Sequence, residues 1–213
     1  MGSYNKGILG PFSGKVGTVV GANWRGKDIM RSLPKRGTHA PTEVQQLQRL
    51  KFLAVNQFLT PINPVLGRYY GSNTGDKTRI NQAMSYHLKE AVNYVAPNFE
   101  ILFNKVQISK GDLVGVQNPT IAAVGGTDVK LDWEDNSGQA GASGNDRLVV
   151  VMYEPASGLY YYSLNAETRA AISTTITLPT YFAGFEVHSW ITFAAADEKK
   201  YATSIYLGSV TLP

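Results

Sequence analysis

The 213-residue sequence contains no cysteine. Disulfide bonds, thiolate metal sites and cysteine-based catalysis are therefore excluded. Charged residues are scarce at 17%, and no apolar run approaches the roughly 20 residues that a membrane-spanning helix needs. The segment from Met1 to Lys6 is not followed by the apolar region of a signal peptide. We expect a soluble protein, made in the cytoplasm without a signal peptide and with no membrane span.

The charges that are present divide the chain into two halves. Residues 1–97 contain 13 Lys or Arg and 4 Asp or Glu, a net charge of +9. Residues 98–213 contain 7 Lys or Arg and 12 Asp or Glu, a net charge of −5. This asymmetry indicates regions with different roles. The 21 glycines and 10 prolines favour turn-rich β structure over a helical bundle.

Residues 1–40 are predicted to form a basic, glycine-rich arm. Two short runs, 15–20 and 28–33, have the composition of β-strands, and the intervening Trp24-Arg25-Gly26-Lys27 is typical of a turn. We expect a β-hairpin. Alternation in the second run places Ile29 and Arg31 on one face, so that neither face is purely apolar. A hairpin of this kind is marginal alone in water and should lie on another surface.

Residues 41–97 are predicted to be helical, as a short helical hairpin. Thr42 and Gln45 match a capping box, and an apolar stripe then continues to Phe58. Two prolines end this first helix at residues 60–64. A second helix is expected over residues 78–95.

Residues 98–213 show short apolar runs that are separated by turn residues, as in an all-β sandwich. The fold class is therefore predicted as α+β in several parts: a β-hairpin arm, a helical hairpin and a sandwich. The predicted strands are 99–108, 129–133, 147–153, 159–163, 174–178, 186–194 and 202–210.

Two resemblances to known families support this division. Asp128 to Trp133, and Leu178-Pro179 followed by the run 184–191, resemble strands of a fibronectin type III or immunoglobulin-like domain, which implies a core at about 118–213. The segment 7–17 (GILGPFSGKVG), then WRG and RSLP, resembles a family of small bacterial and prophage-encoded proteins, and more loosely phage structural proteins. That resemblance implies a virion-associated assembly role and brings no catalytic residue with it.

Motifs for catalysis or cofactor binding are weak. Gly10 to Lys15 is one residue shorter than a phosphate-binding P-loop, and Val16 stands where that loop has Ser or Thr. The three histidines, His39, His87 and His188, have no partner at metal-ligand spacing. The acidic segment 132–135 lacks the order of a calcium-binding loop, although a calcium site there is left open. We expect no enzyme, no cofactor and no metal.

The candidate binding residues are cationic and aromatic. The arm residues share a 22-residue segment: Lys15, Trp24, Arg25, Lys27, Arg31, Lys35 and Arg36. They could bind a nucleic-acid backbone, meet the acidic sandwich of a neighbouring subunit, or form a solvated surface. In the sandwich, Tyr160, Tyr161 and Tyr162 could contact a protein or glycan, or only stabilise the sheet.

The sequence therefore predicts a non-catalytic structural protein of a virion or prophage. Its basic arm would self-associate or dock on a larger assembly, with itself or other structural proteins as partners, and we expect a homo-oligomer. The alternatives are a nucleic-acid-binding protein that uses the arm, and an adhesive module that uses the sandwich loops.

Overall fold

The structure is a computed structural model that describes residues 2–3, 10, 12–24, 26–34, 40–72 and 77–213. It divides into two compact units, Met1–Glu43 and Val44–Pro213. Each unit is described here by itself.

The first unit contains a four-stranded antiparallel sheet in the order β1-β4-β3-β2. Its strands are β1 (Gly2–Ser3), β2 (Gly14–Val16), β3 (Val19–Trp24) and β4 (Lys27–Ser32). The predicted hairpin is confirmed, because β3 and β4 pair in antiparallel from Val19–Ser32 to Trp24–Lys27. The prediction of residues 15–20 as a single strand is wrong. This run folds back at Gly17, whose φ of +59° lies in the left-handed region, and so forms both β2 and β3.

The helices occupy the start of the second unit. They are α1 (Glu43–Leu59), the 3₁₀ turn η1 (Thr60–Ile62), α2 (Asn63–Tyr69) and α3 (Arg79–Glu90). Thr78 caps α3 by accepting a hydrogen bond from the backbone N–H of Asn81 at 3.2 Å. The predicted extension of α3 to residue 95 is wrong. Val92–Val95 is strand β5, which pairs with β6 (Asn98–Ile101), because its valines and tyrosine favour an extended backbone.

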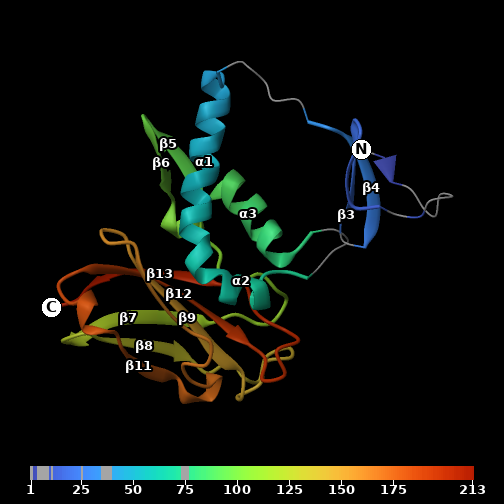
Figure 1. The fold of residues 1–213 in the computed structure, drawn as a ribbon. Helices are drawn as coiled ribbons and strands as arrows, with labels where there is room; N and C mark the ends of the chain where they lie inside the picture. Colours follow the sequence, from blue (N-terminus) through green and yellow to red (C-terminus); the bar gives the residue numbers. More distant parts are fainter. Residues whose placement is uncertain (1, 4–9, 11, 25, 35–39, 73–76) are drawn as a thin grey trace. The chain divides into compact units, whose positions relative to one another are not determined.

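The remaining strands form a sandwich of two antiparallel sheets (Figure 1). One sheet has the order β11-β8-β7, with β7 (Gln117–Gly125), β8 (Asp128–Glu134) and β11 (Ser173–Thr177). The other has the order β10-β9-β12-β13, with β9 (Arg147–Glu154), β10 (Leu159–Ser163), β12 (Glu186–Ala194) and β13 (Ile205–Thr211). The fourth strand in chain order, β10, pairs with β9 rather than joining the three-stranded sheet. The three-plus-four arrangement is that of a fibronectin type III-like sandwich.

Several predicted strands need correction. β7 was not predicted, because Asn118 and Pro119 near its start are typical strand breakers; Asn118 has a φ of 46°, and the pairing with β8 shifts register there. The run 99–108 is a strand only to Ile101 and continues into the 3₁₀ turn η2 (Phe103–Lys105). Two further 3₁₀ turns, η3 (Arg169–Ala171) and η4 (Thr180–Phe182), flank β11.

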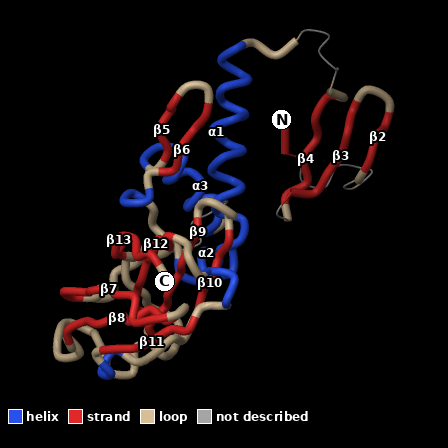
Figure 2. The backbone as a smooth tube through the Cα atoms, turned by 90° about the vertical axis from the view of Figure 1, so that its left-hand side faces the viewer, coloured by secondary structure: helices blue, strands red, loops and turns tan. Residues whose placement is uncertain are grey.

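Two hydrophobic clusters hold the second unit together. One fills the space between the two sheets and includes Leu148, Val150 and Phe193. The other lies between the helices and the outer face of the four-stranded sheet and includes Val55, Phe58 and Trp190. The sequence predicts 41–97 and 98–213 as separate regions. From Val44 onward they lie in one compact unit and share a core, whose first residue along the chain is Val55. The unit has three layers: helices, four-stranded sheet and three-stranded sheet (Figures 1 and 2).

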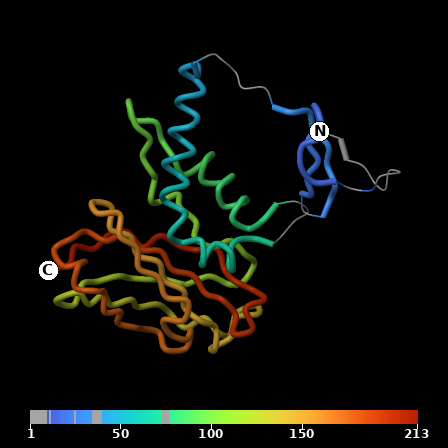
Figure 3. Tube along the Cα trace, in the orientation of Figure 1, coloured from blue at the N-terminus to red at the C-terminus, as the bar shows by residue number. Residues whose placement is uncertain are grey.

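The layers follow the order of the chain. In Figure 3, the sandwich takes its strands from the green-to-red part of the chain, and the helices come from the blue and green part that precedes it. The helices that cover the four-stranded sheet therefore precede its strands in the sequence.

His87 attaches helix α3 to this core. The side chain is fully buried; its Nδ1 lies 2.8 Å from the carbonyl oxygen of Ala83, and its Nε2 accepts a hydrogen bond from the N–H of Gln107 at 3.3 Å. This pair of contacts fits a neutral ring with its proton on Nδ1. Burial lowers the pKa of His87 below 6.5, although the hydrogen bond to Ala83 acts in the opposite direction.

We expect His87 to make the protein less stable in mild acid. Its folded-state pKa lies below the unfolded value, so its contribution is complete above about pH 6.5 and is lost as the pH falls toward the folded pKa. The free energy of unfolding should then fall by up to about 1.4 kcal/mol per pH unit for this one proton. Urea denaturation of the wild type and His87→Gln at pH 7.5 and 5.0 measures the effect. An equally steep pH dependence in the variant would contradict it.

Candidate interaction surfaces

The register of the N-terminal sheet brings its described cations to one face. Lys15 pairs with Val20, and Val20 pairs with Arg31, so these three side chains lie side by side. Trp24 pairs with Lys27 at the hairpin end, four residues further along each strand and therefore on the same face. We call this surface, together with Ala22 and Ile29, the basic face.

Charge is separated across this sheet. In the described strand residues, the basic face has Lys15, Lys27 and Arg31 and no carboxylate. The opposite face has Asp28, whose Oδ1 accepts a hydrogen bond from Asn23 Nδ2 at 2.9 Å. Lys15 and Arg31 are two strand spacings apart, about 10 Å, and Lys27 and Arg31 are four residues apart, about 13 Å. Three cations at these spacings match separate anionic groups on a broad surface rather than a single small anion.

The N-terminal sheet buries few of its apolar side chains. Among the described residues, no hydrophobic side chain before Val55 belongs to a buried core. Gly21 is covered by Phe12, since a Cβ at this glycine would lie 2.3 Å from the Phe12 carbonyl oxygen. Large apolar side chains remain exposed, and Trp24 is 48% exposed. A surface that combines exposed apolar groups with cations is typical of a contact site.

The structure describes four of the seven predicted arm residues and places them together. Lys15, Trp24, Lys27 and Arg31 all lie on the basic face. The other three predicted residues, Arg25, Lys35 and Arg36, lie outside the described residues.

Several exposed apolar side chains of the second unit were not predicted from the sequence. They lie on helix α1 and on or just after the β5–β6 hairpin, two elements that lie beside each other in Figures 1 and 2. The exposed residues are Val44, Leu50, Phe52, Leu53, Tyr94, Val95 and Leu102. The signal available in the sequence was Phe52, which lies nearly half a turn around the helix from Leu50 in the apolar stripe of α1.

The predicted tyrosines of β10 have different environments. Tyr160 packs against the helical layer, where its hydroxyl donates a hydrogen bond to the Phe58 carbonyl oxygen at 2.8 Å and burial raises its pKa. Tyr161 packs against the cluster between the sheets. Tyr162 is 40% exposed. Of the three, Tyr162 offers the largest accessible surface.

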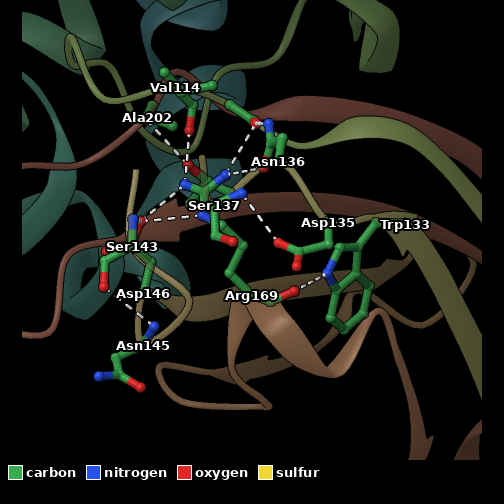
Figure 4. A network of polar contacts seen from close by, with 12 residues as sticks. Val114, Trp133, Asp135, Asn136, Ser137, Ser143, Asn145, Asp146, Arg169 and Ala202 are labelled. Atoms are coloured by element: carbon green, nitrogen blue, oxygen red, sulfur yellow. Dashed lines mark hydrogen bonds and ion pairs between the residues drawn. The ribbon is translucent and has the colours of Figure 1, made fainter. Parts of the chain in front are cut away.

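The loops at one end of the sandwich are joined by a buried arginine, Arg169 (Figure 4). Its Nε and Nη2 each lie 3.0 Å from Asp146 Oδ2, and its Nη2 also donates to the Val114 carbonyl oxygen at 2.9 Å. The Trp133 indole N–H donates to the Arg169 carbonyl oxygen at 2.8 Å. The acidic residues near this end thus take part in structural contacts.

In the acidic turn after β8, the Asp135 carboxylate makes a local hydrogen bond. Asp135 Oδ1 accepts a hydrogen bond from the Ser137 N–H at 3.0 Å, which lowers the pKa of Asp135. In the described part of the chain, no three His, Asp or Glu side chains are arranged to hold a metal ion. His188 is half-buried with its Nδ1 2.7 Å from the Tyr206 hydroxyl, and His39 lies outside the described residues.

No helix in residues 40–72 or 77–213, the segments where the structure has α-helices, is long and apolar enough to cross a membrane.

Comparison with known proteins gives one match over nearly the full length. Residues 11–208 match the Family of unknown function (DUF6266). One matching solved structure is titled "Solution structures of the fn3 domain of human collagen alpha-1(XX) chain". The two chains are 14% identical, the match covers 46% of this chain and 85% of that chain, and the TM-score is 0.35. The comparison with curated proteins gave no match.

Proposed function

Since the chain belongs to the family of unknown function DUF6266, its role has to be inferred from its surfaces, and we propose that it is a non-catalytic assembly protein that docks through the basic face of its N-terminal sheet. The supporting observation is the register that gathers Lys15, Lys27 and Arg31 beside the exposed Trp24. The resemblance of the N-terminal motifs to phage structural proteins favours a virion as the assembly.

A second copy of the chain is the partner that the charges favour. The outer face of the β7-β8-β11 sheet bears Asp128, Asp132 and Glu134 on β8, whereas Val129, Leu131 and Trp133 point into the sandwich. The one cation of this strand, Lys130, is 2.9 Å from Asp132. This surface, which we call the acidic face, has a net negative charge.

The spacing of the two faces is compatible. Lys27 and Arg31 are four residues apart on β4, and Asp128 and Asp132 are four residues apart on β8, about 13 Å in each case. The basic face of one copy and the acidic face of the next are different surfaces. Their contact would be heterologous, which builds rings or open filaments rather than closed pairs.

We expect the triple variant Lys15→Glu, Lys27→Glu and Arg31→Glu to weaken self-association at least a hundredfold at about 50 mM salt, because it places like charges opposite the acidic face. Sedimentation velocity over a concentration series measures the association constant. The same measurement at about 500 mM salt should weaken the wild type, because exposed charges are then screened.

The control is a matched triple reversal at exposed cations of the second unit, Arg49→Glu, Lys89→Glu and Lys105→Glu. This control should associate nearly as the wild type does. A variant with Asp128→Lys and Asp132→Lys should lose self-association but bind the basic-face variant when the two are mixed. A wild type that stays monomeric at low salt, or mixed variants that do not associate, would exclude the proposal.

Single-stranded nucleic acid is the alternative partner that one observation favours. Trp24 is exposed on the same face as three cations, an arrangement that suits base stacking beside phosphate contacts. Binding to an oligonucleotide would then decrease with salt, with a logarithmic slope of about −0.7 per phosphate contacted. Trp24→Ala separates the two functions, since it should weaken oligonucleotide binding by about 1–3 kcal/mol.

A further inference from the structure

A pocket of about 630 Å³ lies in the second unit, where three distant segments of the chain meet. Residues 70–72 follow helix α2, residues 110–112 precede the sandwich, and residues 199–203 lie between β12 and β13. Helix α3 completes the wall with Gln82 and Tyr86. The volume is in the range of pockets that hold small organic ligands.

The backbone framework of this pocket is tightly connected. Tyr70 and Lys110 form a parallel bridge, in which the Lys110 N–H donates to the Tyr69 carbonyl oxygen at 3.0 Å and the Gly71 N–H donates to the Lys110 carbonyl oxygen at 2.8 Å. The Tyr201 hydroxyl donates to the Gly71 carbonyl oxygen. A Cβ at Gly111 would lie 2.1 Å from the Tyr201 carbonyl oxygen, so this close approach requires glycine. These contacts join the three segments that form the pocket.

Positive charge dominates the lining. Among the described residues, Lys110, Lys199 and Lys200 line the pocket together with one carboxylate, Asp112. An adjoining hollow of about 260 Å³ shares Gln82 and Tyr86 with the pocket and adds two lysines and one carboxylate: Lys77, Lys89 and Glu90. The described lining of the two hollows presents five ammonium groups and two carboxylates, and Lys199 Nζ also lies 3.8 Å from Asp197 Oδ2. Such an excess of one charge in a concave surface attracts anions strongly.

Tyr70 separates the pocket from the core of the unit. The residue belongs to the pocket lining, but its side chain is 1% exposed and packs in the cluster below the helices. Its hydroxyl is buried from solvent, and burial raises its pKa, so the group keeps its proton. A ligand in the pocket would therefore contact the lysines and not the Tyr70 hydroxyl.

We propose that this pocket binds a small molecule with two or more phosphate groups. Lysine ammonium groups bind phosphate oxygens as point charges, and the two hollows could hold successive phosphates of one ligand. Nucleic-acid strands fit less well, because two of the three lining tyrosines, Tyr70 and Tyr201, are nearly buried and offer no ring face for base stacking. The site shares no residue with the basic face, so it is independent of the proposed assembly.

Isothermal titration calorimetry of the full chain with sodium tripolyphosphate and with ATP, at about 50 mM salt, tests this site. Both ligands should bind, and the double variant Lys110→Gln and Lys200→Gln should weaken binding at least tenfold. Tripolyphosphate binding without ATP binding would identify inorganic polyphosphate as the source of the phosphates. The reverse result would identify a nucleotide.

The matched control is Arg49→Gln and Lys105→Gln, which removes two exposed cations outside both hollows. It should keep the affinity of the wild type within about twofold, and both double variants should keep its melting temperature. Absence of binding up to 10 mM of either ligand would overturn the proposal. Equal losses in the two double variants would also overturn it, since they would reflect net charge alone.

Discussion

Arg169→Ala is expected to lower the free energy of unfolding by about 3–5 kcal/mol, measured by urea denaturation at pH 7. The guanidinium is fully buried and lies 4.0 Å above the Phe193 ring. Its removal leaves the Asp146 carboxylate, which is 2% exposed, without its cation. It also leaves the Val114 carbonyl oxygen without the Nη2 donor shown in Figure 4. The unpaired, buried Asp146 carboxylate should account for most of the lost free energy of unfolding.

A second arginine provides a close control. Arg147 Nη1 lies 3.3 Å from Glu198 Oε1, nearly the same separation, but the two side chains are 38% and 41% exposed. Arg147→Ala should cost less than about 1 kcal/mol, because water replaces the partner. The double variant Arg169→Met with Asp146→Leu should recover much of the lost stability, since both buried charges are then removed. Equal costs for the two alanine variants would show that the Arg169 contacts do not stabilise the sandwich.

The sandwich was predictable because its signals are local. The runs that became β8, β10 and β12 are short, apolar and bounded by turn residues, and the structure places them within a residue or two of the predicted ends. The packing of the helices on the four-stranded sheet was harder to predict from the sequence. Leu148 to Met152 is an uninterrupted apolar run, and all five residues are fully buried. A run of this kind indicates a strand that is covered on both faces, which a two-sheet sandwich alone does not provide.

The composition of the basic face was predictable only in part. Alternation along one strand predicts that Ile29 and Arg31 lie on the same face, and in the structure both lie on the basic face. Lys15 joins them only through the register of three strands, which the turns at Gly17 and Gly26 fix. The lysine pocket had no local signal. Tyr70 and Lys200 are 130 residues apart, and no short motif connects them.

Phe58→Ala is expected to destabilise the protein by about 3–5 kcal/mol and to loosen the helical layer first. Phe58 comes from α1 and is 5% exposed. Its ring meets those of Tyr153 at 5.3 Å, Tyr160 at 5.9 Å and Trp190 at 6.2 Å between centroids, all on the outer face of the four-stranded sheet. The truncation removes these edge contacts and leaves a cavity between α1 and the sheet.

The control lies on the same helix. Phe52 is 48% exposed, and Phe52→Ala should change the free energy of unfolding by no more than about 0.5 kcal/mol. Hydrogen exchange should show lost protection in α1 and α3 of the Phe58 variant before the β9 and β12 amides exchange, because the sandwich keeps its own inner core of Leu148, Val150 and Phe193. If helices and sheets lose protection together, the two clusters form one cooperative core, and the helical layer cannot open separately to expose the aromatic face of the sheet.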